Sequence, residues 1–283
     1  MMNVLVTGSR GLLGSTIVSI GKEKGVNVIP FEGDITIPDD FKAIDQSVKI
    51  DWVIHAAAMT DVNRCEKEPD LCNRVNVDGT QNAIDFAKSI GAKLLFISTV
   101  SVFSGTEGDY KESDIPGPVG AYNVSKANAE KIVLEYPQGI VVRINIIGIH
   151  KDGSRGKNFL EWAIDSAKQN KDVKIFNDVW MNPLSSVTLA EMLIGMLSKD
   201  LSGNRILHLG SINHLSKAEV ARMVFAHFPS YSGAITEASV DSLPGPKRPK
   251  QMWFNTDTTA QILGVEMPDL ASEVEKAIKP ALR

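Results

Sequence analysis

Cysteine is scarce in this chain, which has only Cys65 and Cys72 among its 283 residues. Two thiols cannot form a disulfide framework, and a metal site would need further Cys or His residues at ligand spacing, which the sequence does not offer. The two cysteines lie seven positions apart, a spacing that places them on one face of a helix. We therefore expect two reduced, structural thiols and no bound metal.

The chain also lacks an excess of basic residues and any long apolar run. The 30 Lys and Arg residues are fewer than the 34 Asp and Glu residues, and the net charge is −4, so the basic surface typical of nucleic-acid-binding proteins is missing. No apolar run reaches the roughly 18 residues that a membrane span needs. The chain runs from Met1 directly into an apolar strand and a glycine motif, which leaves no room for a signal peptide. We expect a cytoplasmic protein with no nucleic-acid or membrane partner.

The first half of the chain alternates short apolar runs with segments of helical period. Strands are expected at residues 4–6, 26–31, 52–55, 93–98 and 139–145, and helices near 12–21, 41–47, 68–90 and 121–136. Such alternation is typical of βαβ units around a parallel sheet. The sequence therefore predicts an α/β fold with a doubly wound parallel sheet of the Rossmann type.

The pattern changes after residue 145. A loop is expected at 146–158, helices near 159–169, 187–197, 217–227 and 270–278, one strand near 206–209, and a loop at 244–249, PGPKRP. We expect a Rossmann domain from residues 1–147 and about 184–209. A smaller C-terminal substrate-binding lobe, from about 148–183 and 210–283, would cover the carboxyl edge of the sheet, where open α/β sheets bind ligands.

The clearest functional motif is the glycine-rich stretch at residues 7–14, TGSRGLLG, which follows the first expected strand and opens the first expected helix. Glycine suits a tight turn where the backbone approaches a pyrophosphate, and the helix N-terminus offers unpaired N–H groups. The motif predicts dinucleotide binding by Gly8, Ser9, Arg10, Gly11, Leu12 and Leu13. Its Gly-x-x-Gly-x-x-Gly spacing resembles the short-chain dehydrogenase/reductase superfamily.

A second motif, YNVSK at residues 122–126, places Tyr122 and Lys126 on one helix face. A nearby ammonium favours the phenolate, so we expect Lys126 to lower the pKa of Tyr122 toward working pH. The phenol can then act as an acid toward a carbonyl or as a base toward an alcohol. The resemblance further implies that Lys126 hydrogen-bonds the nicotinamide ribose.

A hydroxyl-rich stretch, STVSVFSG at residues 98–105, lies between these motifs. Matched to the pattern of extended short-chain reductases, it implies that Thr99 carries the catalytic hydroxyl, with Ser98 and Ser101 as alternatives. Thr99 would hydrogen-bond the substrate carbonyl oxygen and orient Tyr122. In residues 74–80, RVNVDGT, the resemblance makes Asn76 a support for this geometry, although a structural role in a helix explains it equally well.

These stretches together resemble the dTDP-4-dehydrorhamnose reductase family over nearly the whole chain. Residues 33–36 (GDIT), 55–62 (HAAAMTDV), 177–183 (NDVWMNP) and 247–249 (KRP) also match its segments. The further cofactor contacts that the resemblance implies are Asp34, Ile35, Ala56, Ala57, Ala58, Thr60, Asn76, Tyr122 and Lys126. The expected substrate contacts are Val62, Ser101, Asp178, Trp180 and Arg248.

The family reduces the C4 ketone of a nucleotide-linked 6-deoxy sugar with NAD(P)H, and the resemblance implies this reaction, with Tyr122 as the acid. Arg10, inside the glycine loop, suits a 2′-phosphate, so NADP(H) is favoured and NAD(H) stays open. Two departures from the family pattern fall near the expected sugar site. Val100 replaces an acidic residue, and RINI at 143–146 replaces an Arg-Thr-Ser-Trp pattern.

Two alternatives stay open. A sugar-nucleotide epimerase or dehydratase with retained NAD would have the same fold, but a dehydratase would need a carboxylate pair beside the catalytic hydroxyl, and residues 99–101 offer none. A non-catalytic, cofactor-binding regulatory subunit is favoured by Val100 and opposed by the intact pair of Tyr122 and Lys126. The sequence leaves open the sugar, the nucleotide and whether the chain forms a homodimer.

Overall fold

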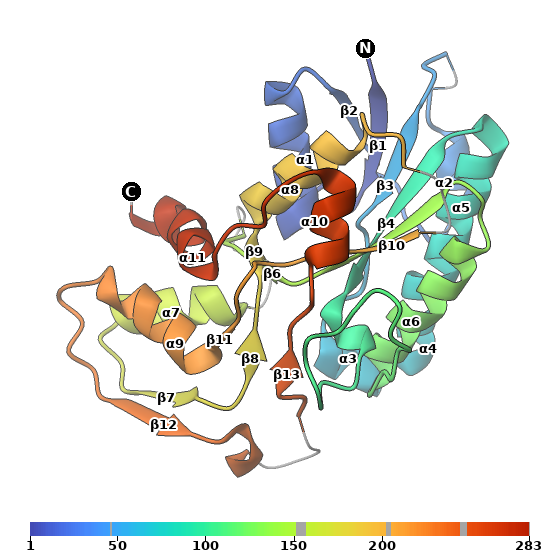
Figure 1. Ribbon diagram of the computed structural model, residues 1–283. Coiled ribbons are helices and arrows are strands. Elements are labelled where there is room, and N and C mark those ends of the chain that lie inside the picture. The colour runs from blue at the N-terminus through green and yellow to red at the C-terminus, as the bar shows by residue number, and fades with distance from the viewer. Residues whose placement is uncertain (46, 151–156, 202–204, 244–247, 283) are drawn as a thin grey trace. The chain divides into compact units, whose positions relative to one another are not determined.

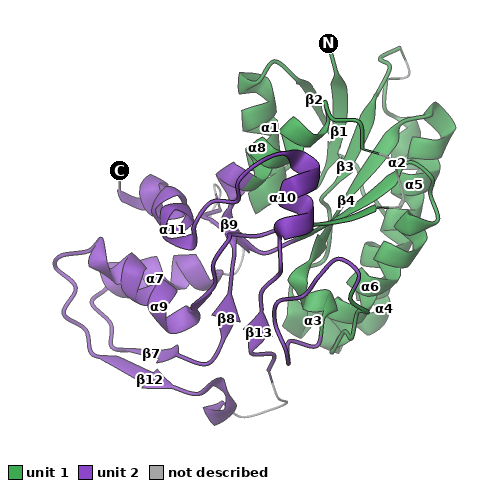
Figure 2. Ribbon diagram, viewed as in Figure 1, with its two compact units in different colours: residues 1–103, 114–143, 189–207 green, residues 104–113, 144–188, 208–283 purple. Residues whose placement is uncertain are grey.

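A computed structural model of the chain describes residues 1–45, 47–150, 157–201, 205–243 and 248–282. The chain divides into two compact units, drawn in different colours in Figure 2. Unit 1 comprises residues 1–103, 114–143 and 189–207, and unit 2 comprises residues 104–113, 144–188 and 208–283. The domain bounds expected from the sequence stay a prediction.

Unit 1 holds most of a six-stranded sheet with the order β10-β5-β4-β3-β1-β2 (Figure 1). Its strands are β1 (Asn3–Thr7), β2 (Asn27–Pro30), β3 (Trp52–His55), β4 (Lys93–Thr99), β5 (Gly139–Ile144) and β10 (Arg205–Leu209). β1 pairs in parallel with β2 and β3, and β3 pairs in parallel with β4. The inner strands are buried along almost their whole length, because helices cover both faces of the sheet. The predicted α/β fold with a parallel central sheet is confirmed.

The helices of unit 1 agree with the sequence prediction only in part. The unit contains α1 (Leu12–Glu23), α2 (Pro38–Lys42), α3 (Val62–Lys67), α4 (Pro69–Asn73), the π-helical turn η1 (Arg74–Asp78), α5 (Gly79–Ile90), the 3₁₀ turn η2 (Val100–Val102), α6 (Ala121–Leu134) and most of α8 (Ser186–Met196). No helix was expected at α3. The helix expected at 41–47 lies at α2 instead, because Pro38 takes its first position and Asp39 and Asp40 its first turn. The helix expected at 68–90 is made of α4, η1 and α5 in succession.

The strand order places the functional segments of unit 1 at one sheet edge. The chain order changes direction between β1 and β3, and the parallel register pairs Thr7 with His55 and His55 with Phe96. The carboxyl ends of β1, β3 and β4 therefore lie side by side. In doubly wound sheets ligands bind at such a point of reversal.

The core of unit 1 lies between the sheet and α2, α5 and α6. Phe41 of α2 stacks on Phe31 with ring centroids 4.4 Å apart and contacts Phe86 of α5 at 5.4 Å. Leu94 and Phe96 of β4 are fully buried in the same cluster. Burying a side chain of this size contributes about 1.5–3 kcal/mol, so this core fixes β4 against α5 and α6.

Unit 2 is built from short strands and helices of its own. They are β6 (Ile146–Ile147), α7 (Phe159–Lys168), β7 (Val173–Phe176), β8 (Trp180–Met181), β9 (Leu184–Ser185), β11 (Leu215–Ser216), α9 (Lys217–Ala226), β12 (Ile235–Ala238), η3 (Val240–Ser242), β13 (Gln251–Met252), α10 (Asp257–Leu263), α11 (Leu270–Ile278) and η4 (Lys279–Leu282). Residues 151–156 and 244–247 of the two expected loops lie outside the described residues. Within the described ranges no helix is both long and apolar enough to cross a membrane.

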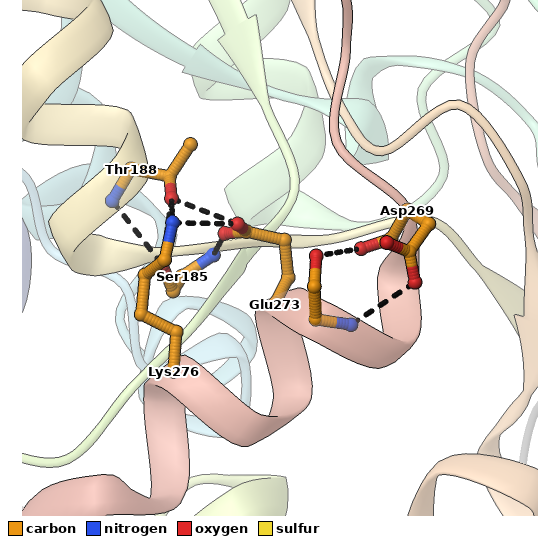
Figure 3. A network of polar contacts seen from close by, with 6 residues as sticks. Ser185, Thr188, Asp269, Glu273 and Lys276 are labelled. Atoms are coloured by element: carbon orange, nitrogen blue, oxygen red, sulfur yellow. Dashed lines mark hydrogen bonds and ion pairs between the residues drawn. The ribbon is translucent and has the colours of Figure 1, made fainter.

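A buried carboxylate holds α11 in place in unit 2. Glu273 accepts hydrogen bonds from the Ser185 backbone N–H at 2.7 Å and from the Thr188 hydroxyl at 2.8 Å, and Lys276 pairs with it at 3.0 Å (Figure 3). Asp269 caps the same helix by accepting the Ser272 N–H at 3.0 Å. These polar contacts supplement the apolar packing of α7, α9 and α11.

Candidate active site

The glycine motif forms a loop that side chains would obstruct. Gly8 has a φ of +68°, and a Cβ at this position would lie 2.7 Å from the Ala57 backbone nitrogen. A Cβ at Gly14 would collide with the Gly8 carbonyl oxygen. Gly11, at the start of α1, has no side chain to cap the helix, so the first-turn N–H groups are open to a ligand. A pyrophosphate fits this arrangement, because it needs close backbone approach and unpaired donors.

The other expected cofactor residues lie on loops that follow β1, β2 and β3. Ser9 is buried and Arg10 exposed. Asp34 is exposed and accepts hydrogen bonds from the Thr36 backbone and hydroxyl, both at 2.8 Å. Ile35 is buried, and its carbonyl accepts a hydrogen bond from Asn82 at 2.9 Å. The segment 56–60 directly follows β3 at the carboxyl edge of the sheet.

Thr99 and Tyr122 are brought together although they lie 23 positions apart in the sequence. Thr99 ends β4, Tyr122 lies in the first turn of α6, and the Thr99 hydroxyl is close enough to the phenol to affect its pKa. Burial raises the pKa of Tyr122 to about 12, and the neighbouring Thr99 hydroxyl opposes that shift. The lowering of this pKa that we expected from Lys126 is therefore wrong. A phenol with this pKa stays protonated at neutral pH and can donate a proton.

Lys126 points at β4, which explains why it does not lower the pKa of Tyr122. Its Nζ donates a hydrogen bond to the Ile97 carbonyl at 2.7 Å and lies 3.9 Å from the centre of the Phe96 ring. Burial lowers the pKa of Lys126 to about 7, and the charge of Glu130 opposes that shift. Lys126 is thus a buried cation whose charge depends on its surroundings at neutral pH.

Asn76 connects the segment after β3 to the helix of Tyr122. Its Oδ1 accepts the Met59 N–H at 2.8 Å, and its Nδ2 donates to the Ser125 hydroxyl at 2.9 Å. Ser125 in turn donates to the Tyr122 carbonyl at 2.7 Å. Asn76 lies in the π-helical turn η1, a distortion that is frequent at functional sites. Sequence reasoning assigned no role to Ser125, although it lies inside the YNVSK motif.

His55 is a buried structural residue of this edge. Its ring lies 2.7 Å from the Thr7 hydroxyl and 3.1 Å from the Thr80 hydroxyl. Burial first, and the charge of Lys126 second, lower the pKa of His55 to about 3. The imidazole is therefore neutral near pH 7 and holds β1, β3 and α5 together through its two hydrogen bonds.

The expected substrate residues are distributed over both units. In unit 1, Val62 is exposed, and the Ser101 N–H donates to the Thr99 hydroxyl at 3.1 Å. In unit 2, Arg248 is exposed and Trp180 meets the His214 ring edge-on at 5.6 Å.

Asp178 of unit 2 already has a partner at each carboxylate oxygen. It accepts hydrogen bonds from the Ser239 hydroxyl at 2.5 Å and the Val240 N–H at 2.8 Å, and it forms an ion pair with Lys250 at 2.9 Å. Burial by itself raises the pKa of Asp178, but these partners together lower it to about 2. The carboxylate therefore supports the loop that carries it.

The two cysteines form a disulfide, so the prediction of reduced thiols is wrong. They lie on two helices rather than one, because the chain breaks at Glu68 and Pro69 between α3 and α4. Their Cα atoms are 5.1 Å apart, within the range that a disulfide spans. Cys72 Sγ lies 3.5 Å from the Ser125 hydroxyl, so the bridge is a neighbour of the Asn76 contacts.

Comparisons with known proteins cover almost the whole chain. Residues 2–283 match the sequence model of the family described as RmlD substrate binding domain. The dTDP-4-dehydrorhamnose reductase of Aggregatibacter actinomycetemcomitans is 29% identical, covering 95% of this chain and 96% of that protein. Methionine adenosyltransferase 2 subunit beta of Xenopus laevis is 26% identical, covering 87% and 79%. The crystal structure of a dTDP-4-dehydrorhamnose reductase from Bacillus anthracis in complex with NADP is 26% identical, with a TM-score of 0.88 and 99% of both chains covered.

Proposed function

The chain belongs to the family described as RmlD substrate binding domain, and from this premise we propose that it is an NADPH-dependent reductase of a nucleotide-linked 4-keto-6-deoxy sugar. The observation that carries the proposal is the position of the Thr99 hydroxyl, at the end of β4, beside the phenol of Tyr122. The names of relatives support the substrate class, since one is a dTDP-4-dehydrorhamnose reductase and a solved one holds NADP. The first substrate to test is therefore dTDP-4-dehydrorhamnose.

In ketone reduction, Tyr122, Thr99 and Lys126 of unit 1 have different roles. NADPH, when bound, supplies the hydride that adds to the ketone carbon. Tyr122 donates its phenolic proton to the ketone oxygen, so that the product is the neutral alcohol. Thr99 orients Tyr122 and donates a hydrogen bond to the same oxygen as negative charge develops there. Lys126 contributes a positive charge one helical turn away and binds the ribose of the cofactor.

The cofactor is held by the loops after β1, β2 and β3. Open N–H groups at the start of α1 bind the pyrophosphate, and Arg10 binds the 2′-phosphate that distinguishes NADPH. Asp34 and Ile35 lie at the adenine, and the segment 56–60 lies along the remainder of the dinucleotide. For the sugar nucleotide we propose direct contacts from Val62, Ser101, Trp180 and Arg248. Asp178, whose oxygens have partners, contributes by ordering its loop.

The test is NADPH oxidation by the purified protein with freshly prepared dTDP-4-dehydrorhamnose, with the product identified by mass spectrometry. We expect one sugar alcohol formed for each NADPH consumed. Parallel reactions with dTDP-glucose and NAD⁺ test the dehydratase alternative. Conversion of dTDP-glucose without added reductant, or NAD⁺ retained through purification, would replace the reductase proposal.

A regulatory role is the second candidate, and a specific observation favours it. One relative over 87% of the chain is a subunit of methionine adenosyltransferase, a name that places it in an assembly with another chain. NADPH binding without turnover of any 4-keto sugar, together with a co-purifying enzyme, would support this role. The retained pair of Tyr122 and Lys126 favours the reductase.

A further inference from the structure

The end of β4 and one face of α6 meet in three neighbouring contacts. Three consecutive residues of β4 contact three residues of α6 that are spaced four apart, the spacing of one helix face. The pairs are Thr99 with Tyr122, the Ile97 carbonyl with Lys126 at 2.7 Å, and Ser98 with Glu130 at 2.5 Å. The first two pairs belong to the proposed catalytic machinery, whereas Glu130 has no role in it so far.

Glu130 is a buried anion with a complete set of partners. Its side chain is 3% exposed and that of Arg143 is 1% exposed. Arg143 donates to both carboxylate oxygens, at 2.9 and 2.8 Å, and Ser98 donates to one of them. Arg143 comes from β5, the strand next to β4. The carboxylate is therefore fixed from two neighbouring strands as well as from its own helix.

Stability alone is a weak reason to keep such a group. Removing two charges from water costs several kcal/mol per ion, and buried ion pairs are often replaceable by apolar side chains without loss of stability. A fixed buried charge acts strongly on another charge nearby, since water does not screen it. The nearest charge among the three contacts is Lys126, one helical turn from Glu130.

The groups that face Lys126 come from α6 and from two strands. They are Tyr122 and Glu130 on α6, the Ile97 carbonyl and Phe96 ring on β4, and His55 at the end of β3. His55 is neutral near pH 7, and Arg143 is held by Glu130. Among the described residues, Glu130 is the carboxylate whose charge favours the protonated form of Lys126. Burial acts in the opposite direction and lowers the pKa of Lys126 to about 7.

We propose that Glu130 is a positioning residue, whose carboxylate keeps the Lys126 side chain charged one helical turn from Tyr122. Ser98 and Arg143 hold the carboxylate in place. The consequence for ketone reduction rests on the proposed function, but the effect on the charge of Lys126 does not. The two are therefore tested by separate measurements.

The direct test is the titration of Lys126 in the cofactor-free protein. Lysine labelled with ¹³C at Cε reports protonation by NMR, and the Lys126 signal is the one that disappears in Lys126→Arg. We expect Glu130→Gln to lower the midpoint of this titration by about one pH unit, because a neighbouring opposite charge shifts a pKa by 1–3 units and Arg143 partly offsets the charge of Glu130. Glu135→Gln, which removes an exposed carboxylate just after the same helix, should leave the midpoint unchanged.

A second variant guards against misfolding of Glu130→Gln, which leaves Arg143 buried without its anion. The double variant Glu130→Gln/Arg143→Met removes both charges and replaces the buried arginine by a flexible, uncharged side chain that fills more of its space than a shorter residue would. It should still lower the Lys126 midpoint, but by less than the single variant, because loss of the Arg143 charge acts in the opposite direction. An unchanged midpoint in a folded variant, either single or double, would overturn the inference.

The activity profile separates this inference from the proposed function. If the wild-type protein reduces the 4-keto sugar, the alkaline limb of its kcat profile should move to lower pH in Glu130→Gln by the same amount as the Lys126 titration. If Glu130→Gln shifts the Lys126 titration but the wild-type protein has no reductase activity, the effect of Glu130 on Lys126 is supported and the proposed function is contradicted. An active wild type with identical pH profiles in both proteins would uphold the reductase and remove the positioning role.

Discussion

Asn76 donates a hydrogen bond to the Ser125 hydroxyl at 2.9 Å and thereby joins the π-helical turn η1 to the helix that carries Tyr122. Ser125 passes the connection on to the Tyr122 carbonyl at 2.7 Å. The backbone of Tyr122 is thus tied to the segment that follows β3. Because that segment also borders the glycine loop at Gly8, one chain of contacts sets the phenol relative to the proposed cofactor loop.

Asn76→Ala should destabilise the protein by about 1–3 kcal/mol, because the partly buried N–H of Met59 and the buried Ser125 hydroxyl both lose a hydrogen-bond partner. Urea unfolding measures this change. Asn128→Ala on α6 is the matched control, because the Asn128 side chain accepts an exposed hydrogen bond from Lys131. This variant should change the free energy of unfolding by less than about 0.5 kcal/mol. Equal stabilities of the two variants would contradict the role given to Asn76.

Gly8→Ala should weaken NADPH binding by at least about tenfold, because the new Cβ would lie 2.7 Å from the Ala57 nitrogen and must displace the loop. Gly25→Ala separates this clash from backbone strain. Gly25 has a similar φ of +73°, but no atom lies within 4 Å of the position that an alanine methyl group would take, so it should cost only the strain of about 1–2 kcal/mol. Fluorescence titration with NADPH measures the affinity of both variants. Unimpaired binding by Gly8→Ala would refute the assignment of the glycine loop to the cofactor.

The free energy of unfolding should fall as the pH drops from about 6.5 toward 4. The pKa of His55 is lowered from 6.5 to about 3 in the folded protein, so below pH 6.5 the unfolded chain binds a proton that the folded one does not. Stability is then lost at up to about 1.4 kcal/mol per pH unit. His55→Gln should flatten this dependence in urea unfolding, whereas His227→Gln should not. If the free energy of unfolding falls with pH equally steeply in wild type and His55→Gln, another group controls this pH dependence.

The central sheet and the family were predictable from the sequence, and both predictions are confirmed. The buried strands read as continuous apolar runs because helices cover both faces, and the glycine motif at residues 7–14 has a fixed place after the first strand. Helices α7, α9 and α11 of unit 2 were predicted from the sequence, whereas α10 was not. The two-residue strands of this unit, such as β8 and β11, are too short to show any period.

The electrostatics of the site could not be predicted from spacing. Tyr122 and Lys126 share a helix face, which suggested a direct effect of the ammonium on the phenol. The Lys126 ammonium instead hydrogen-bonds the Ile97 carbonyl and lies over the Phe96 ring. Both residues belong to a strand about 30 residues earlier in the chain. The pairing of Glu130 with Arg143 and the disulfide of Cys65 with Cys72 likewise depend on how helices and strands pack.

The most direct test of the central claim compares Tyr122→Phe with wild type in NADPH oxidation with dTDP-4-dehydrorhamnose. Loss of the proton donor should reduce kcat by about 10²–10⁴-fold, while NADPH binding and folding stay intact. Tyr231→Phe, which removes a hydroxyl bound to the Lys171 carbonyl at the surface of unit 2, should retain wild-type turnover. Full turnover by Tyr122→Phe would contradict the assignment of Tyr122 as the acid.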